Sequence, residues 1–254
     1  MSRDTVGAVA VRHALLSHQG LVRGNNEDSG YAGTRLFAVA DGVGGAVAGE
    51  IASGLAEESL RPLDDAPPDD PVAALRKAMR TANQKIAAAI EKDSGLSGMA
   101  TTVTAVLFSD GSGGLGAEFG LAHVGDSRAY RYAGDELTQL TRDDTYVQHL
   151  VDAGRLTEEE ARTHPQRSVV TNVLQGDQPD SATASYTRHT AEPGERYLLC
   201  SDGLTDYAEL DEITTTLRAE RDPKGCAQAL VDLALVAGAP DNVTVLVLDI
   251  TDSR

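Results

Sequence analysis

The strand-forming and helix-forming segments of this chain come in groups and do not alternate singly. Apolar runs typical of strands at residues 9–16 and 35–40 precede two helical patterns at 49–60 and 71–92. The remaining predicted elements are strands at 101–108, 117–124, 127–132, 137–140, 184–188, 196–200 and 243–250, and helices at 210–220 and 223–237. This order disfavours a doubly wound parallel sheet and favours an α+β fold, in which paired helices flank two antiparallel sheets.

Three features describe the organisation of the chain between these elements. The sequence GSGG at 111–114 predicts a hairpin loop. The polar stretch from about 145 to 176 is helical in pattern at first and then irregular, which predicts a flap outside the sheets. A length of 254 residues without an internal repeat or a domain-scale linker predicts a single domain over residues 1–254.

The composition limits the kinds of molecule that this protein is expected to bind. A net charge of −17 repels nucleic acid and anionic membranes. No secretory signal opens the chain, and no apolar run approaches the ~18 residues of a membrane span. Cys200 and Cys226 lie in apolar patterns and are expected to be buried, reduced thiols. We therefore expect a cytoplasmic protein, in which an anionic substrate would need bound cations to reverse the local field.

Acidic residues recur where apolar strand runs end. Asp41, Asp126, Asp202 and Asp241 each lie beside Gly, Ser or Asn at such an end or at the turn into a strand, while Glu27 and Asp28 are expected in a loop after an early strand. Strand ends place side chains at one rim of a sheet, where several carboxylates would repel one another. Hard divalent cations relieve that repulsion, and oxygen ligands suit Mg²⁺ and Mn²⁺ equally well.

Several competing motifs fail at specific residues. The glycines after Asp41 do not form a dinucleotide-binding loop, because Val47 stands where the third Gly belongs, and they do not form a P-loop, because Glu50 replaces its Lys. The sequence GDSRA is no nucleophile elbow, since Ala129 replaces the last Gly. Neither cysteine is followed by Arg at the spacing of a cysteine-dependent phosphatase, and the chain has no HExxH zinc motif.

Six short motifs, in order, resemble those of the PP2C family (the PPM class) of protein phosphatases. Residues 23–28 fit RxxNED, 41–45 fit DGxGG, 98–102 fit GxxTT, 124–128 fit VGDSR, 201–204 fit SDGL, and 241–242 fit the terminal DN. Together they extend over nearly the whole chain and resemble the bacterial type. The resemblance implies an α-β-β-α sandwich and a metal-dependent serine/threonine phosphatase that works without a covalent intermediate.

The resemblance also implies roles for individual residues. It implies that Asp41 bridges two metal ions, with the Gly42 carbonyl as a further ligand. Asp202 and Asp241 would complete the first metal site, and Glu27 and Asp28 would hold the second ion. Asp126 and Asp202 would hold a third. Arg23 would bind the substrate phosphate and, with Asp41, Asp202 and Asp241, forms the implied catalytic set; Asn242 would orient the metal-bound water. Taken alone, Arg23 also fits a surface salt bridge, and Asp126 also fits a turn-capping carboxylate.

Two positions depart from the family pattern. Val43 stands where many eukaryotic members carry a His that protonates the leaving group, so a metal-bound water is an alternative acid. Asp144 stands where the family often has the His of Thr-x-Asp-His-Ser. Thr101 and Thr102 are interpreted as strand packing, and Ser127 and Arg128 as structural residues.

The resemblance implies hydrolysis of phosphoserine and phosphothreonine in proteins, opposing bacterial Ser/Thr kinases. The expected partners are phosphorylated proteins and those kinases, with no nucleic acid and no membrane, and the protein is expected to be a monomer. A catalytically silent binding module on the same fold is the alternative, although none of the implied metal-binding acids is missing. A phosphatase of one dedicated regulator, such as an anti-sigma-antagonist protein, is a third interpretation.

Overall fold

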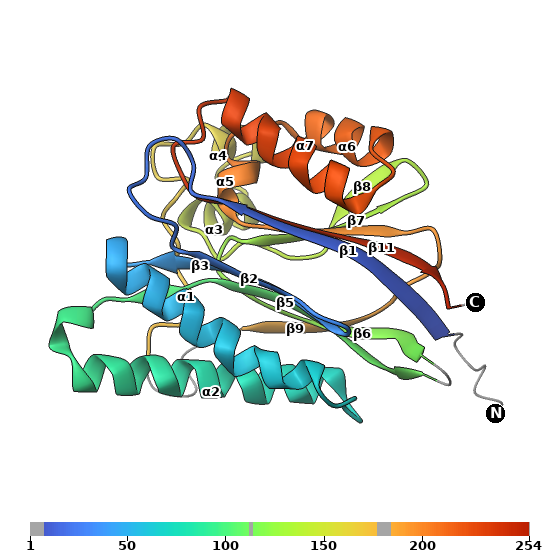
Figure 1. The fold of residues 1–254 in the computed structure, drawn as a ribbon. Coiled ribbons are helices and arrows are strands. Elements are labelled where there is room, and N and C mark those ends of the chain that lie inside the picture. The colour runs from blue at the N-terminus through green and yellow to red at the C-terminus, as the bar shows by residue number, and fades with distance from the viewer. Residues whose placement is uncertain (1–7, 112–113, 177–183, 254) are drawn as a thin grey trace.

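A computed structural model describes residues 8–111, 114–176 and 184–253. The chain forms four layers, in the order helix, sheet, sheet, helix (Figure 1). The first sheet contains β2 (Asp28–Ala32), β3 (Leu36–Val43), β5 (Val103–Gly111), β6 (Gly114–Val124) and β9 (Ser185–Thr190), and the short β4 (Ala100–Thr101) pairs with β3. The second contains β1 (Ala8–His18), β11 (Val243–Asp252), β10 (Arg196–Cys200), β7 (Arg128–Ala133) and β8 (Glu136–Gln139). All of these pairs are antiparallel, and a short β1–β6 pairing joins the two sheets.

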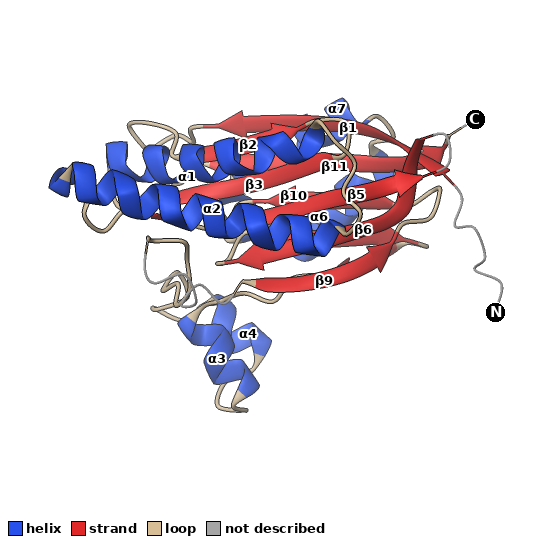
Figure 2. Cartoon of the chain, turned by 90° about the horizontal axis from the view of Figure 1, so that it is seen from below, coloured by secondary structure: helices blue, strands red, loops and turns tan. Residues whose placement is uncertain are grey.

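Two pairs of helices cover the outer faces of the sheets. Helices α1 (Ala46–Leu60) and α2 (Pro71–Lys92) lie on the first sheet, and α6 (Leu210–Ala219) and α7 (Pro223–Val236) lie on the second (Figure 1). The one-turn helix α5 (Asp202–Thr205) follows β10, and two short 3-10 turns lie at Arg61–Asp64 and Ser94–Leu96. Helices α3 (Tyr146–Asp152) and α4 (Glu158–Arg162) project from the side of the sandwich (Figure 2).

The strand sequences explain the four layers, because the central strands are apolar on both faces. In β3, Leu36 packs toward α1 and α2, whereas the next residue, Phe37, packs between the two sheets. In β10, Leu199 faces the inter-sheet core and Leu198 faces α6 and α7. Side chains alternate along a strand, so each continuous apolar run supplies two cores at once. The result is three apolar layers between four layers of secondary structure.

The structure confirms the predicted fold class and most predicted elements. Residues 71–92 form α2 as predicted: Asp70 caps its first turn by accepting from the Val72 and Ala73 amides, and Pro71 occupies the first helical position. The strand predicted at 196–200 is β10. Both cysteines are free and buried, as expected. The predicted hairpin loop at 111–114 includes residues 112–113, which lie outside the described residues.

One expectation about the acidic residues was wrong, and another was confirmed but incomplete. Asp28 was expected in a loop, but it begins β2 and pairs with Asp41 of β3. The sequence DSGYA conceals this strand because all five residues are half-buried and show no polar–apolar alternation. Asp202 was assigned only to a strand end, whereas it is the first residue of α5. None of the helices in the described ranges combines the length and apolar character needed to cross a membrane.

Candidate active site

The β2–β3 pairing brings two of the predicted carboxylates face to face. Asp28 and Asp41 are directly opposed in the ladder. The Oδ2 atom of Asp28 accepts a hydrogen bond from Ser201 Oγ at 2.8 Å, which ties it to the residue before Asp202. Its Oδ1 atom is buried and has no hydrogen-bond partner. An acidic oxygen in that state is costly unless it binds a proton or a cation.

The backbone of Asp41 is held on both sides by the threonines of the GxxTT motif. Thr102 Oγ1 accepts from the Asp41 amide at 3.1 Å, and the Asp41 carbonyl accepts from the Thr102 amide at 2.9 Å and from Thr101 Oγ1 at 3.0 Å. Thr102 Oγ1 also contacts Ser127 Oγ at 2.5 Å, next to Asp126 in the chain. These threonines thus fix the position of Asp41 relative to the segment that carries Asp126.

Five aspartates interact electrostatically in one site. Burial, followed by the charges of Asp28, Asp202, Asp126 and Asp241, raises the pKa of Asp41 well above its ordinary value. The predicted ligands from β2, β3, α5 and the two turns before Ser127 and β11 therefore lie near enough to influence one another. Their proximity in the fold explains why charges so distant in the sequence affect one another.

The other members of the cluster show the same response. Burial raises the pKa of Asp28 to about 6, although hydrogen bonds from Thr244 and Ser201 lower it in part. Burial, together with the charges of Asp143 and Asp206, raises the pKa of Asp126 to about 7. The pKa of Asp202 is also raised, by burial and then by Asp126. Each of these carboxylates is thus held where burial and neighbouring charge disfavour its ionised form.

The chemistry of these donors fits hard divalent cations. Asp28 and Asp202 each present a buried Oδ1 atom without a partner, and the surrounding donors are oxygens. Among the described residues, no three acidic, His or Cys side chains already close around one point, so the fit lies in the unpartnered oxygens and the raised pKa values. Cations of the Mg²⁺ or Mn²⁺ type satisfy such oxygens and remove the repulsion.

Two glycines beside the carboxylates permit close backbone packing. A Cβ atom on Gly42 would overlap the Gly49 carbonyl of α1, and one on Gly203 would overlap the Asn242 carbonyl. Gly42 follows Asp41 and Gly203 follows Asp202 in the chain. The close contacts let α1 and the start of β11 approach the cluster, which any side chain at these positions would prevent.

Asn242 fixes the loop that carries Arg23 and Glu27. Its Oδ1 atom accepts from the Glu27 amide at 2.8 Å, and its Nδ2 atom donates to the carbonyls of Gln19 and Asn25 at 2.8 and 2.9 Å. The side chain is buried. Its observed contacts position this loop, while the predicted role toward a metal-bound water stays a prediction.

Arg23 and Glu27 lie at the edge of the cluster. Arg23 Nη2 donates to Asp241 Oδ2 at 2.7 Å, and both side chains remain partly exposed, at 49% and 29%. Burial raises the pKa of Glu27, and the Arg23 charge opposes that effect. The Glu27 carboxylate lies against Gly49 at the start of α1. Arg23 therefore has both the position and the solvent access to meet an anion that approaches the carboxylates.

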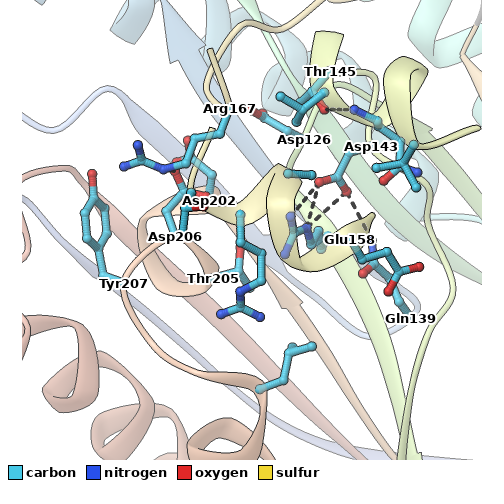
Figure 3. Close-up of a pocket in the computed structure, with 18 of the residues that line it drawn as sticks. Asp126, Gln139, Asp143, Thr145, Glu158, Arg167, Asp202, Thr205, Asp206 and Tyr207 are labelled. Carbon is cyan, nitrogen blue, oxygen red and sulfur yellow. Dashed lines mark hydrogen bonds and ion pairs between the residues drawn. The ribbon is translucent and has the colours of Figure 1, made fainter. Parts of the chain in front are cut away.

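A pocket of about 550 Å³ extends from the cluster beneath the flap (Figure 3). Asp126, Asp202 and Asp206 line it together with flap residues, among them Arg167, which lies beside Asp206. Arg167 Nε lies 3.5 Å from Asp206 Oδ2. Asp206 was missed by the sequence analysis; its position four residues after Asp202, one helical turn later, is the signal that could have found it.

An ion pair between half-buried Arg128 and buried Asp143 lines this pocket. The guanidinium of Arg128 donates to both carboxylate oxygens of Asp143, from Nε at 3.0 and 2.9 Å and from Nη2 at 2.6 Å. Arg128 follows Asp126 by two residues, so this bidentate pair anchors the Asp126 turn to the segment before the flap. The structural role predicted for Arg128 agrees with these contacts.

Asp144 joins the Asp126 turn to the root of the flap. Its Oδ2 atom accepts from the Gly125 amide at 3.0 Å and from Asn172 Nδ2 at 3.2 Å. Its own amide donates to the Gly125 carbonyl at 2.7 Å, and its carbonyl accepts from the Thr171 amide at 2.7 Å. A bridge between Thr101 and Leu174 ties the same returning segment to the threonine that holds Asp41. The flap is thus hydrogen-bonded to the turn that carries Asp126 and to Thr101, which holds the Asp41 backbone.

Comparisons with known proteins agree with this geometry. Residues 25–233 match the family model described as protein phosphatase 2C. The serine/threonine protein phosphatase PstP of Mycobacterium tuberculosis is 48% identical over 253 residues, covering 99% of this chain and 47% of that protein. The chain therefore spans about half the length of this curated relative.

Two solved structures extend the comparison to the fold. A crystal structure of the M. tuberculosis phosphatase PstP has a TM-score of 0.90 and 48% identity, covering 95% of this chain and 99% of that one. A structure of the PstP catalytic domain in complex with two manganese ions has a TM-score of 0.88 and 46% identity, covering 96% and 100%. Both support the two-sheet architecture described above.

Proposed function

The chain belongs to the protein phosphatase 2C family, and we propose that it hydrolyses phosphoserine and phosphothreonine in proteins. The observation that carries this proposal is the convergence of five aspartates, two with buried and unpartnered oxygens, beside a half-exposed arginine. A 48% identical relative is named a serine/threonine protein phosphatase, which supports the same activity.

The cofactors are two divalent cations, Mg²⁺ or Mn²⁺, with a third at Asp126 and Asp202. Asp41 and the Gly42 carbonyl would hold the first two ions, and Asp202 and Asp241 would hold the first. Glu27 and Asp28 hold the second ion, and the direct position of Asp28 opposite Asp41 supports its part. The two manganese ions in the related PstP structure support the same number of ions in the central site.

When bound, the cations would supply an activated water and neutralise the substrate phosphate. The chain's own residues then position the reactants. Arg23 exchanges its bond to Asp241 for the phosphate oxygens, to which a guanidinium can donate two parallel hydrogen bonds. Asn242 keeps the Arg23 loop in place, and Thr101 and Thr102 keep the Asp41 backbone fixed. Val43 has no proton to donate, and we propose a metal-bound water as the acid that protonates the leaving oxygen.

The partners are phosphorylated proteins, including Ser/Thr kinases and their targets, and not nucleic acid or membranes. The strongly acidic composition supports the exclusion of nucleic acid and anionic lipid. We further propose one PP2C-like domain over residues 1–254 with its flap at 145–176, acting as a monomer in the cytoplasm.

Hydrolysis of a phosphothreonine peptide tests this proposal. Phosphate release by the purified protein should require Mn²⁺ or Mg²⁺, stop with EDTA, and fall at least about 100-fold in Asp41→Asn. The matched control is Asp65→Asn, which changes an exposed aspartate after the 3-10 turn that follows α1 and should leave the rate unchanged. No release by folded protein under any metal condition would favour the silent binding module.

A further inference from the structure

In the described part of the chain, most exposed large apolar side chains lie in segments that carry or adjoin the acidic cluster. All but one of those found among the described residues lie in segments that border the site. We call this set the apolar rim; it consists of Leu21, Val22, Val43, Val47, Tyr146, Val169 and Leu210. The remaining one, Val236, is at the C-terminal end of α7 in the outer helix layer.

One side of the rim flanks Arg23 and Asp41. Leu21 and Val22 are 63% and 71% exposed and directly precede Arg23, which is bonded to Asp241. The Leu21 amide donates to the Ala239 carbonyl at 2.8 Å, so this loop is held in place with its apolar side chains in solvent. Val43 follows Gly42 at the end of β3, and Val47 lies in the first turn of α1.

The other side of the rim belongs to the flap and to the start of α6. The Tyr146 amide donates to the Val169 carbonyl at 2.9 Å, which places these two residues together at the root of the flap. Leu210 lines the pocket that also contains Asp126 and Asp202. Rim residues thus occur both in the loop before Arg23 and in the segments that carry the flap and begin α6.

Core packing does not account for these side chains, because they are exposed. Single exposed apolar residues are ordinary, but a gathering that borders a catalytic site marks a surface that contacts a ligand. The net charge of this chain, taken alone, favours substrate segments rich in basic residues, because an acidic protein attracts basic segments at long range. The rim residues themselves offer apolar side chains to a bound segment, next to charged residues such as Glu158, Arg162 and Arg167 that line the pocket under the flap.

We propose that the apolar rim binds apolar side chains of the substrate polypeptide on both sides of the phosphorylated residue. This inference rests on the proposed phosphatase function. The occupant is an extended phosphorylated segment, because Leu21 and Val22 directly precede Arg23, the proposed phosphate ligand, and Leu210 lines the pocket that contains Asp126 and Asp202. Flanking Leu, Ile or Val would lose exposed area against Leu21, Val22, Tyr146 and Val169, which favours such substrates through apolar burial.

Kinetics with paired peptides test the rim. Two phosphothreonine peptides differ only in having Leu or Ser at the positions next to the phosphothreonine, and p-nitrophenyl phosphate serves as a small substrate without flanking residues. Wild-type protein should show a kcat/KM about three- to tenfold higher for the Leu peptide. The double substitution Leu21→Ser with Val22→Ser should remove most of this preference and leave hydrolysis of p-nitrophenyl phosphate unchanged.

Matched variants separate this inference from a general loss of fold or function. Val236→Ser changes an 89% exposed valine outside the rim and should keep the wild-type preference. Tyr146→Ser with Val169→Ser should weaken the preference from the flap side. Equal kcat/KM for both peptides in the wild-type protein, or a preference that the rim variants retain, would overturn the inference. Absence of metal-dependent activity on all three substrates would instead contradict the proposed function on which it rests.

A second copy of the chain is the competing occupant. Sedimentation of wild type and of the Leu21/Val22 double variant addresses it directly. Self-association that the double variant abolishes, together with unchanged peptide kinetics, would assign the rim to a dimer interface and overturn the substrate role. A wild-type monomer with the expected peptide preference supports it.

Discussion

Asp28→Asn should stabilise the metal-free protein while destroying its metal site. Asp28 is opposed to Asp41, and one of its oxygens is buried without a partner, so its negative charge is unfavourable in the fold. Asparagine has nearly the same shape, keeps an oxygen to accept from Ser201 Oγ, and carries no charge. The substitution therefore removes repulsion without opening a cavity.

The size of the effect follows from the pKa. Burial raises the pKa of Asp28 from an ordinary 3.8 to about 6. Because the folded state binds the proton more tightly than the unfolded state, stability is greatest at low pH and falls as pH rises toward 6. Above the folded-state pKa, the Asp28 charge lowers the free energy of unfolding by roughly 3 kcal/mol. At pH 5 about half of that loss is already present. The unfolding temperature of a chain this long changes by about 2–4 °C per kcal/mol.

Urea or thermal unfolding in EDTA at pH 5 and pH 8 provides the measurement. Asp28→Asn should exceed wild type at both values, with the larger gain at pH 8. Adding Mn²⁺ should stabilise wild type and have a smaller effect on the variant, because the ion binds the native carboxylates. A variant less stable than wild type at pH 8 without metal would refute the argument, since it would mean that the Asp28 charge is already satisfied in the fold.

Three further predictions concern neighbouring residues. Arg23→Ala should raise KM for a phosphopeptide more than it lowers kcat, because the arginine binds phosphate, and Arg23→Lys should recover part of the loss; unchanged KM would remove it from the site. Asp126→Ala should raise the Mn²⁺ concentration for half-maximal activity several-fold, and a wild-type metal titration would argue against a third ion. Asp144→Ala should speed proteolytic cleavage of residues 145–176 severalfold, whereas Asp144→Asn, which retains an accepting oxygen, should resemble wild type; equal cleavage of both would show that Asp144 does not hold the flap.

The parts of the fold that could be predicted from sequence are those with a strong pattern. Strands β10 and β11 are continuous apolar runs, because both faces of each are buried, and α2 has helical periodicity with a capping Asp70. Strand β2 was not predicted because its five half-buried residues carry no periodic signal. The one-turn helix α5 is also too short to show a period.

The site was predictable to the extent that strand ends determine it. Asp202 and Asp241 lie just after one strand and just before another, and Asp41 lies two residues before the end of β3, so the proximity of such ends follows from the sheet architecture. Contacts between distant segments had no such signal. The bond from Arg23 to Asp241 joins residues 218 positions apart, and the bond from Ser201 to Asp28 joins residues 173 apart. Those pairings depend on the packed fold and not on any local pattern.

The close backbone contacts at Gly42 and Gly203 have a consequence for saturation mutagenesis. In a screen scored by activity alone, every substitution at these two positions would look like a substitution of a catalytic residue, because a Cβ would displace α1 or the start of β11 from the cluster. Scoring the same library for protein abundance would separate the two classes. Variants of Asp28 and Asp41 would accumulate as folded, inactive protein, whereas variants of the two glycines would be depleted from the folded pool.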